Sequence, residues 1–283
     1  MNHLTEQGLR KTLSDLPLGG IRFLEQTGST NDMALAWASE GAPDLSLVVA
    51  EEQTAGRGRF GRKWVTAPGT ALAFSLILRP RLVERDVIPL YSALGALAIA
   101  TTLEEKYGLK AEIKWPNDVL LARQKVCGIL AEAVWLENRA ESVVLGIGLN
   151  VRAEAIPSAE SFSFPAISLE TATGQGVDRI KLLHAIITAL IAWRPRVGCG
   201  EFISAWEDRL AFRGEWVHVW AEDQRQRVPS RTGVPPLFAA RTVLRSVRAG
   251  QVEGLDRDGS LRLRPLEGEA FTVRFGEVHL RPV

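Results

Sequence analysis

Cysteine is scarce in this chain of 283 residues, where only Cys127 and Cys199 occur. They do not form a Cys-x-x-Cys pair, and the four histidines are scattered along the sequence. A disulfide scaffold needs more cysteines, and a zinc site or a histidine-based triad needs ligands or partners that cluster. The sequence therefore disfavours all three.

Net charge and long uninterrupted apolar runs are lacking as well. The formal net charge is +1, which argues against a general basic coat for nucleic acid or membranes. Residues 1–24 contain no apolar core of a secretory signal. The most apolar run, 87–103, is interrupted by Pro89 and several hydroxyl groups, which favours a buried helix over a membrane span. We therefore expect a cytoplasmic protein with no membrane partner.

Hydrophobic residues make up 46% of the chain, enough for a substantial core, and the length suggests about two domains. Alternation and apolar runs predict strands at 21–25, 47–52, 71–78, 112–115, 125–134 and 142–149. Helical periodicity predicts helices at 29–39, 85–107 and 178–193. Because strands and helices do not alternate regularly, the expected fold class is α+β.

The pattern changes after about residue 214, where short alternating segments dominate. Strands are predicted at 216–220, 250–254, 260–264, 271–275 and 278–280, with Asp258-Gly259 as a hairpin turn. This pattern fits a small antiparallel barrel of SH3 size, with residues 222–241 as an inserted loop. We therefore expect one domain at 1–213 and a second at 214–283.

One segment, from Gln53 to Trp64, crowds three glycines and four cations (Arg57, Arg59, Arg62 and Lys63) between a strand and a tryptophan. The glycines permit tight turns and close backbone approach, and the cations would repel one another without an anion among them. The segment therefore predicts a mobile lid that binds phosphate or carboxylate. It also matches Gly-x-Gly-x-x-Gly, but no helix is expected after Gly61 and no acid lies 20 residues further on, so a dinucleotide fold is disfavoured.

Four further motifs each have a structural and a functional interpretation. Lys114-Trp-Pro-Asn-Asp118 is either an ordinary turn or a polar site after a strand. Lys125 is either an ordinary surface lysine or part of a site, since Gly128, three residues further on, would let a ligand approach the strand. The glycines of Gly146-Ile-Gly-Leu-Asn150 indicate bulges or a ligand. Ser29-Thr30-Asn31 precedes Asp32, which makes either a capping box or a helix N-terminus open to a polar ligand.

Taken together, these five motifs resemble those of the biotin protein ligases in order and spacing, over residues 20–150. The resemblance implies a mixed-sheet catalytic domain with flanking helices, like that of class II aminoacyl-tRNA synthetases, followed by an SH3-like domain. It also implies a two-step reaction. Biotin and ATP with Mg²⁺ give biotinyl-5′-adenylate, and a lysine of a biotin carboxyl carrier protein then takes the biotin.

The resemblance also implies the site residues. The implied catalytic residues are Lys125, Arg57, Arg59 and Asp118. The implied biotin site is Ser29, Thr30, Asn31, Gln53, Arg57, Gly58, Arg59, Lys125, Gly128 and Gly146. The implied ATP and adenylate site is Arg57, Arg59, Arg62, Trp64, Asn117, Asp118, Lys125 and Asn150. No dedicated metal site is implied.

Two departures from the family pattern affect these expectations. The motifs begin after about twenty residues, too few for a winged-helix domain, so we expect a ligase that does not bind DNA; a homodimer is compatible with the resemblance. At the position where the family can place an aromatic ring over adenine this chain has Ala166, which leaves Phe162 or Phe164 as substitutes.

Two alternative functions stay open at the level of sequence. A lipoate-protein ligase shares the fold and the adenylate chemistry, although such enzymes usually lack the Gly-Arg-Gly-Arg-x-Gly loop. A non-enzymatic RNA-binding module could use the arginines for phosphate and Trp64 for stacking. It is disfavoured because aromatic residues are not interleaved with the cations.

Overall fold

The computed structural model describes residues 3–136, 139–156, 164–221, 245–274 and 278–282, and the chain divides into two compact units, Met1–Ala211 and Phe212–Val283. The helices of the first unit are α1 (Glu6–Thr12), α2 (Thr30–Ser39), α3 (Tyr91–Tyr107), α4 (Leu169–Thr173), α5 (Arg179–Trp193) and α6 (Gly200–Glu207). Its strands are β1 (Gly20–Thr27), β2 (Ser46–Arg57), β3 (Lys63–Thr66), β4 (Ala71–Leu78), β5 (Ala111–Lys114), β6 (Asp118–Leu121), β7 (Gln124–Leu136) and β8 (Arg139–Asn150). Short 3-10 helices include η1 (Arg59–Gly61), η2 (Leu82–Leu90), η3 (Ala153–Ala155) and η5 (Arg194–Arg196).

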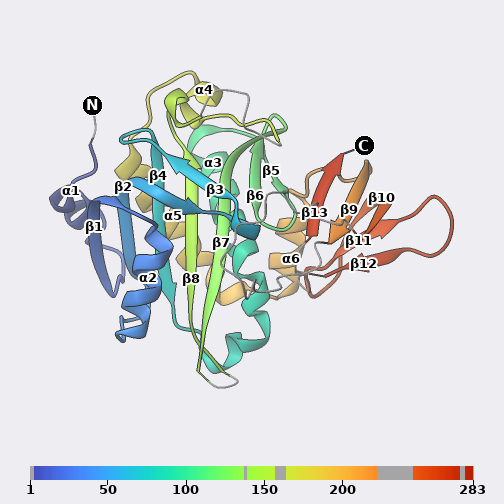
Figure 1. The fold of residues 1–283 in the computed structure, drawn as a ribbon, viewed down its shortest axis with the longest axis horizontal. Coiled ribbons are helices and arrows are strands. Elements are labelled where there is room, and N and C mark those ends of the chain that lie inside the picture. Colours follow the sequence, from blue (N-terminus) through green and yellow to red (C-terminus); the bar gives the residue numbers. More distant parts are fainter. Residues whose placement is uncertain (1–2, 137–138, 157–163, 222–244, 275–277, 283) are drawn as a thin grey trace, which may run out of the picture. The chain divides into compact units, whose positions relative to one another are not determined.

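These eight strands form one mixed sheet (Figure 1). The strand order is β1-β2-β4-β8-β7-β6-β5, with β3 pairing on β2. β1 and β2 are parallel, with α2 as the crossover between them. The other pairs are antiparallel. The predicted α+β class with a mixed sheet is confirmed.

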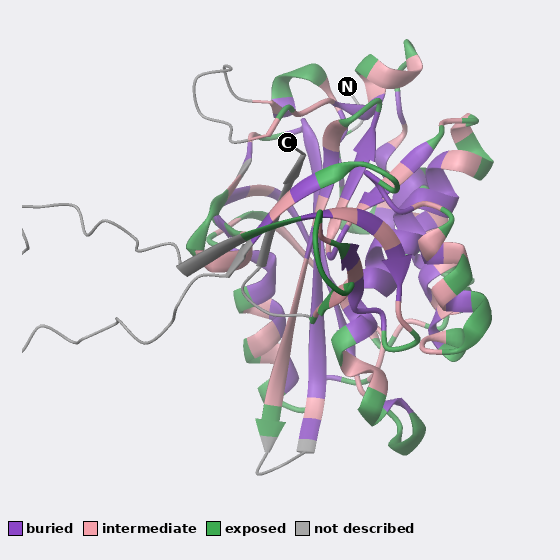
Figure 2. Ribbon diagram, turned by 90° about the vertical axis from the view of Figure 1, so that its right-hand side faces the viewer, coloured by how far each residue is buried: buried purple, intermediate pink, exposed green. Residues whose placement is uncertain are grey.

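Helices cover both faces of this sheet. α2 packs on a cluster that includes Ile77 of β4 and Val144 of β8. In α3, a Cβ at Gly95 would lie 3.1 Å from Ile129 Cγ2 and 3.5 Å from Leu145 Cδ1. Since side chains alternate along a strand, Val144 and Leu145 point to opposite faces, so α2 and α3 lie on opposite sides of the sheet. α5 packs on α3. Strands β4 and β8 are almost entirely buried between these layers, whereas β7 is mostly of intermediate exposure (Figure 2).

The predicted helix at 85–107 begins later than expected. Residues Leu82–Leu90 form the 3-10 helix η2, and the α-helix runs from Tyr91 to Tyr107 before Gly108 ends it in the left-handed conformation. Pro89 has no N–H to donate, which favours the α-helix starting after it. Leu82–Tyr107 is long and apolar enough to cross a membrane by length and composition alone, yet 72% of its most apolar window is buried inside the protein, as in a core helix.

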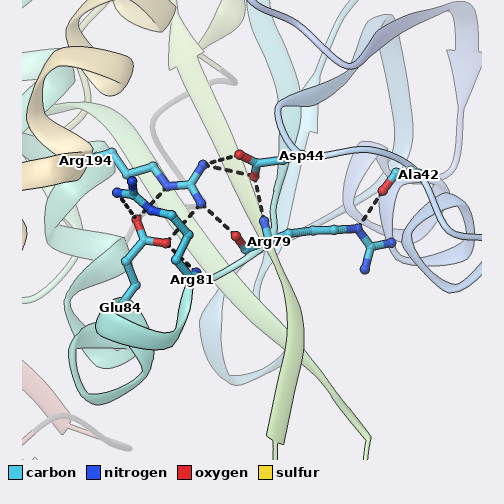
Figure 3. Close-up of polar contacts among 6 residues, drawn as sticks. All are labelled: Ala42, Asp44, Arg79, Arg81, Glu84 and Arg194. Atoms are coloured by element: carbon cyan, nitrogen blue, oxygen red, sulfur yellow. Dashed lines mark hydrogen bonds and ion pairs between the residues drawn. The ribbon is translucent and has the colours of Figure 1, made fainter.

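An ion network centred on the buried Arg194 and Glu84 joins η2, the turn before β2 and the C-terminal end of α5 (Figure 3). Arg194, after α5, donates from Nε to Glu84 Oε1 of η2 at 3.0 Å and from Nη1 to Asp44 Oδ2 at 2.7 Å. Burial alone would raise the pKa of Glu84, but hydrogen bonds from Arg194 and Arg81 outweigh it and hold that pKa below its ordinary value. Burial and the nearby Glu84 charge raise the pKa of Tyr91 to about 12.

The second unit contains β9 (Trp216–Ala221), β10 (Arg245–Leu255), β11 (Leu261–Arg264), β12 (Phe271–Val273) and β13 (Val278–Pro282). They form an open antiparallel sheet in the order β12-β11-β10-β9-β13. The predicted strands and the turn at Asp258-Gly259 are confirmed, with Gly259 at φ 78°. Closure into an SH3-like barrel is not confirmed, and the predicted insertion at 222–241 lies outside the described residues.

Candidate active site

The side chains predicted to bind a ligand gather on the α2 face of the sheet, next to the N-terminus of α2. Gly146, Gly148 and Asn150 alternate along β8 and therefore share one face. Ser75 of β4 pairs with Gly146, and Gly128 of β7 pairs with Gly148. Three neighbouring strands thus form the floor of the candidate site.

A buried polar cluster forms one end of this floor. Thr30 donates to Gln53 Oε1 from its backbone nitrogen at 2.8 Å and from Oγ1 at 3.0 Å. Ser75 Oγ lies 2.8 Å from Thr30 Oγ1 and 2.6 Å from Asn31 Oδ1. The four side chains are 9% exposed or less, so their polar atoms are held in fixed positions.

The structure corrects the predicted role of Ser29 and explains the glycine at position 146. Ser29 occupies the N-cap position of α2, but its side chain does not cap the helix, so the predicted capping box is wrong. Asp32, the expected partner in that box, pairs instead with Arg57 at 2.7 Å. A Cβ at Gly146 would lie only 2.0 Å from Asn31 Oδ1, so this glycine makes room for the Asn31 amide.

The glycine- and arginine-rich segment folds as a hairpin, which we call the β2–β3 hairpin (residues 53–66). β3 pairs with β2 from Gln53↔Thr66 to Arg57↔Lys63, whereas the sequence predicted a loop. Its tip holds Phe60 and Gly61 at φ 60° and 70°, the positive values of a tight hairpin turn. No helix follows Gly61, in agreement with the rejection of a dinucleotide fold.

Trp64 of this hairpin lies over the floor. A Cβ at Gly148 would meet Trp64 Cε2 at 2.4 Å, and one at Gly128 would meet Trp64 Cζ3 at 3.2 Å. The indole therefore packs directly on these two glycines. Within the part of the chain that the structure describes, its buried Nε1 has no hydrogen-bond acceptor.

Lys125 lies beside Trp64 and brings a positively charged ammonium group to the glycine floor of the site. Its Nζ is 2.6 Å from Asp118 Oδ1 and 5.7 Å from the centroid of Trp64. A Cβ at Gly128 would meet Nζ at 3.1 Å, so the missing side chain of Gly128 gives the ammonium group its space. Burial raises the pKa of the neighbouring Cys127 thiol, which disfavours a cysteine nucleophile here.

The remaining predicted residues flank this centre. Arg59 Nη1 donates to Asn117 Oδ1 at 3.0 Å, which links the hairpin to the Lys114-Trp-Pro-Asn-Asp118 motif. Asn150 Nδ2 donates to Ile167 O at 3.3 Å. The segment 165–167 also forms backbone hydrogen bonds with Lys125. A Cβ at Gly58 would have only contacts of 3.5 Å or longer, and Arg62 lies exposed near the tip.

Of the two aromatic residues predicted to stack on adenine, Phe162 and Phe164, the structure describes only Phe164. Phe164 lies under the Lys114 ammonium, 4.1 Å from the ring centroid. Phe162 lies outside the described residues. Among the described residues no three His, Cys, Asp or Glu side chains gather as a metal site.

Three residues of this region were missed at the level of sequence: Ser75, Glu132 and Asp32. Ser75 is the single polar residue of an apolar strand. Glu132 lies four residues after Gly128 on β7, and alternate residues of a strand face the same side, so Glu132 shares the face of Gly128. It accepts two hydrogen bonds from Arg57 and one from Asn31 Nδ2. The spacing of Gly128 and Glu132 could be read from the sequence, whereas the contacts of Glu132 with Arg57 and Asn31 could not.

This arrangement combines a buried polar cluster, a glycine floor, a paired lysine and a cationic hairpin, which suits the binding and activation of a small carboxylic acid. Comparison with known proteins agrees. The Biotin/lipoate A/B protein ligase family matches residues 23–150. A biotin–[acetyl-CoA-carboxylase] ligase of Paracoccus denitrificans is 34% identical over 90% of this chain and 100% of its own length.

Other relatives are similar over most of the chain. The bifunctional ligase/repressor BirA of Bacillus spizizenii is 31% identical over 94% of this chain and 76% of its own length. The biotin protein ligase from Aquifex aeolicus in complex with biotin and ATP has a TM-score of 0.72 and 27% identity, over 93% of this chain and 99% of that chain. The chain belongs to the biotin protein ligases of this family.

Proposed function

We propose that this protein activates biotin with MgATP and transfers it to a lysine of a biotin carboxyl carrier protein. In the first step a biotin carboxylate oxygen bonds to the α-phosphorus of ATP and pyrophosphate leaves. In the second step the carrier amine attacks the acyl carbon, AMP leaves, and the amine loses a proton. The relatives named above are biotin ligases, which disfavours the lipoate alternative.

One observation carries the proposal: Lys125 Nζ lies over Gly128, beside Trp64 and paired with Asp118, at the centre of the candidate site. Two unit charges about 4 Å apart repel by about 4 kcal/mol at an effective dielectric near 20. A carboxylate that approaches the α-phosphate therefore needs a cation between the two groups. Lys125 supplies it in our proposal, and its ion pair with Asp118 positions the ammonium.

The surrounding residues support assigned roles for the two substrates. We assign Ser29, Thr30, Asn31 and Gln53, which are each 9% exposed or less, to the biotin head group, because fixed polar atoms favour a polar ring. The Trp64 Nε1 donor has no described acceptor, and a ligand oxygen would satisfy it. Arg59, Arg62, Asn117, Asp118 and Asn150 are assigned to the nucleotide side.

The RNA-binding alternative is not supported. The relatives that match most of this chain are biotin ligases.

Several finer assignments belong to the same proposal. Residues 1–213 carry the chemistry, since every contact described for the candidate site lies in the Met1–Ala211 unit. Residues 214–283 form an SH3-like domain, which the five antiparallel strands of the second unit support. The protein acts in the cytoplasm as a ligase that does not bind DNA, in keeping with the net charge of +1. A homodimer is compatible with β1 at the sheet edge.

The test is biotin-dependent release of pyrophosphate from MgATP, with lipoate in parallel. Lys125→Ala should lower the rate by about 100-fold or more, because it removes a charge aimed at the transition state. Lys181→Ala is the matched control, since that lysine is exposed on α5 and pairs only loosely with Asp178 at 3.6 Å. Equal rates for the two variants would contradict the role of Lys125. Turnover of lipoate in place of biotin would contradict the substrate.

A further inference from the structure

Arg57 of the β2–β3 hairpin is bracketed by two carboxylates. Its Nη1 donates to Glu132 Oε1 at 2.9 Å and its Nη2 to Glu132 Oε2 at 2.8 Å, a bidentate pair. The same Nη2 lies 2.7 Å from Asp32 Oδ1. One cation therefore faces two anions, one on β7 and one on α2.

The charges around Arg57 distinguish it from an arginine that binds an anionic ligand. With Glu132 and Asp32 ionised, the three side chains sum to one negative charge. A carboxylate or phosphate that approached Arg57 would compete with a bidentate pair, the strongest arrangement open to a guanidinium. The Arg57 side chain is thus occupied by holding the hairpin to the two elements below it.

Glu132 also reaches the buried polar cluster. Its Oε2 accepts from Asn31 Nδ2 at 2.7 Å, and Asn31 Oδ1 lies 2.6 Å from Ser75 Oγ. A single carboxylate therefore joins the hairpin above the site to the polar atoms that form its floor. Glu132 is 26% exposed and Arg57 is 38% exposed, against 57% for Asp32, so Glu132 is the better shielded of the two acids.

We propose that Glu132, assisted by Asp32, is a positioning residue that holds the β2–β3 hairpin over β7 and β8 through Arg57 and so retains the activated acid. Glu132 touches no reacting atom. It acts by keeping Trp64 and Arg59 of the hairpin in place over the floor. The retention of biotinyl-adenylate rests on the proposed function, whereas the clamp on the hairpin does not.

Tryptic cleavage tests the clamp directly, since the hairpin contains Arg59, Arg62 and Lys63. Cleavage after Arg62 and Lys63, followed by mass spectrometry, follows the population of the opened hairpin when opening and closing are fast. Glu132→Gln should accelerate it by about tenfold, because the charge-assisted bidentate pair is lost. Asp32→Asn should accelerate it by about threefold or less, as expected for an exposed pair.

Two further variants control this experiment. Glu141→Gln removes a carboxylate on the adjacent strand β8 whose partner is Arg79 at 3.4 Å, and it should cleave at the wild-type rate. Arg57→Lys keeps the charge and the tryptic site but loses the bidentate fork. It should behave like Glu132→Gln, and it covers the case in which Glu132→Gln does not fold. Wild-type cleavage rates in both Glu132→Gln and Arg57→Lys would overturn the proposal.

Kinetics separate the clamp from the proposed function. If the wild-type protein releases pyrophosphate with biotin, Glu132→Gln should raise the amount of free biotinyl-adenylate per pyrophosphate formed by about tenfold. A fall in kcat without more free biotinyl-adenylate per pyrophosphate would show a different role for Glu132. If the wild type shows no biotin-dependent release, the proposed function fails, and the tryptic comparison still decides the clamp.

Discussion

Among single residues, Gly146 and Gly148 show how the absence of a side chain can serve a neighbouring side chain of the protein itself. Gly146 accommodates the amide of Asn31, and Gly148 accommodates the indole of Trp64. Asn31 cannot move freely, because its amide contacts both Ser75 and Glu132. A methyl group at Gly146 would therefore displace an atom that belongs to the polar cluster of the site.

We expect Gly146→Ala to raise the KM for biotin by at least about tenfold and to destabilise the protein by about 1–3 kcal/mol, as overpacking does. Pyrophosphate release at varied biotin and thermal unfolding measure the two effects. Gly176→Ala is the control, because a Cβ there meets nothing within 4 Å, and it should match wild type. An unchanged KM in Gly146→Ala would contradict the placement of biotin beside Asn31.

Among elements, the ion network of Figure 3 fastens η2 and the turn before β2 to the end of α5. Glu84 is 4% exposed, and a buried carboxylate is stabilising only while it stays paired. The hydrogen bonds from Arg194 and Arg81 lower the pKa of Glu84. The folded state therefore binds this proton less readily than the unfolded chain does.

The sign of the pH dependence follows from that lowered pKa. The contribution of Glu84 is present above its unfolded pKa, near 4.5, and is lost as pH falls through the lower folded value. We expect the Tm of the wild type to fall more steeply below about pH 4.5 than that of Glu84→Gln. Glu40→Gln, which alters an exposed pair with Arg22, should keep the wild-type slope. Parallel slopes for wild type and Glu84→Gln would refute the role of Glu84.

At the scale of the whole molecule, the site spans elements far apart in sequence. The N-terminus of α2, the β2–β3 hairpin and strands β4, β7 and β8 all contribute to it. A ligand bound among them should stabilise the first unit as a whole. Binding at about 100 times Kd adds about 2.7 kcal/mol, and about 2–4 °C in Tm per kcal/mol is usual for a unit of this size.

We therefore expect biotin with MgATP to raise the Tm by about 5–10 °C, as measured by calorimetry. Lipoate with MgATP should leave the Tm unchanged within about 1 °C. A larger shift with lipoate than with biotin would favour the rival acid.

The sequence predicted the elements that bury a continuous apolar face better than it predicted long-range contacts. The strand at 71–78 was predicted with the bounds of β4, and the helix at 178–193 within one residue of α5. β3 was missed because glycine and arginine indicate a loop, while its pairing with β2 is decided in three dimensions. Closure of the second sheet also depends on long-range pairing, which alternation does not encode.

The candidate site follows the same distinction. Motif order named Lys125, Gln53 and Thr30. In the structure Thr30 donates to Gln53 Oε1, and Lys125 lies beside Gly128 and Trp64. The Arg57–Glu132 pair joins residues 75 positions apart. Nothing local in either strand marks the other residue, so only the fold could supply that contact.

The contacts among Thr30, Gln53, Ser75 and Asn31 have a consequence for the count of hydrogens. Three oxygen–oxygen contacts join them, yet the two hydroxyls bring only two hydrogens, and the amide oxygens bring none. If a ligand donates an N–H to Gln53 Oε1, Thr30 can turn its hydrogen to Ser75 and Ser75 can donate to Asn31. A cyclic urea such as that of biotin carries such N–H groups, whereas the dithiolane ring of lipoate carries none. The site would then distinguish biotin from lipoate by one hydrogen bond, because only biotin can donate an N–H to Gln53 Oε1.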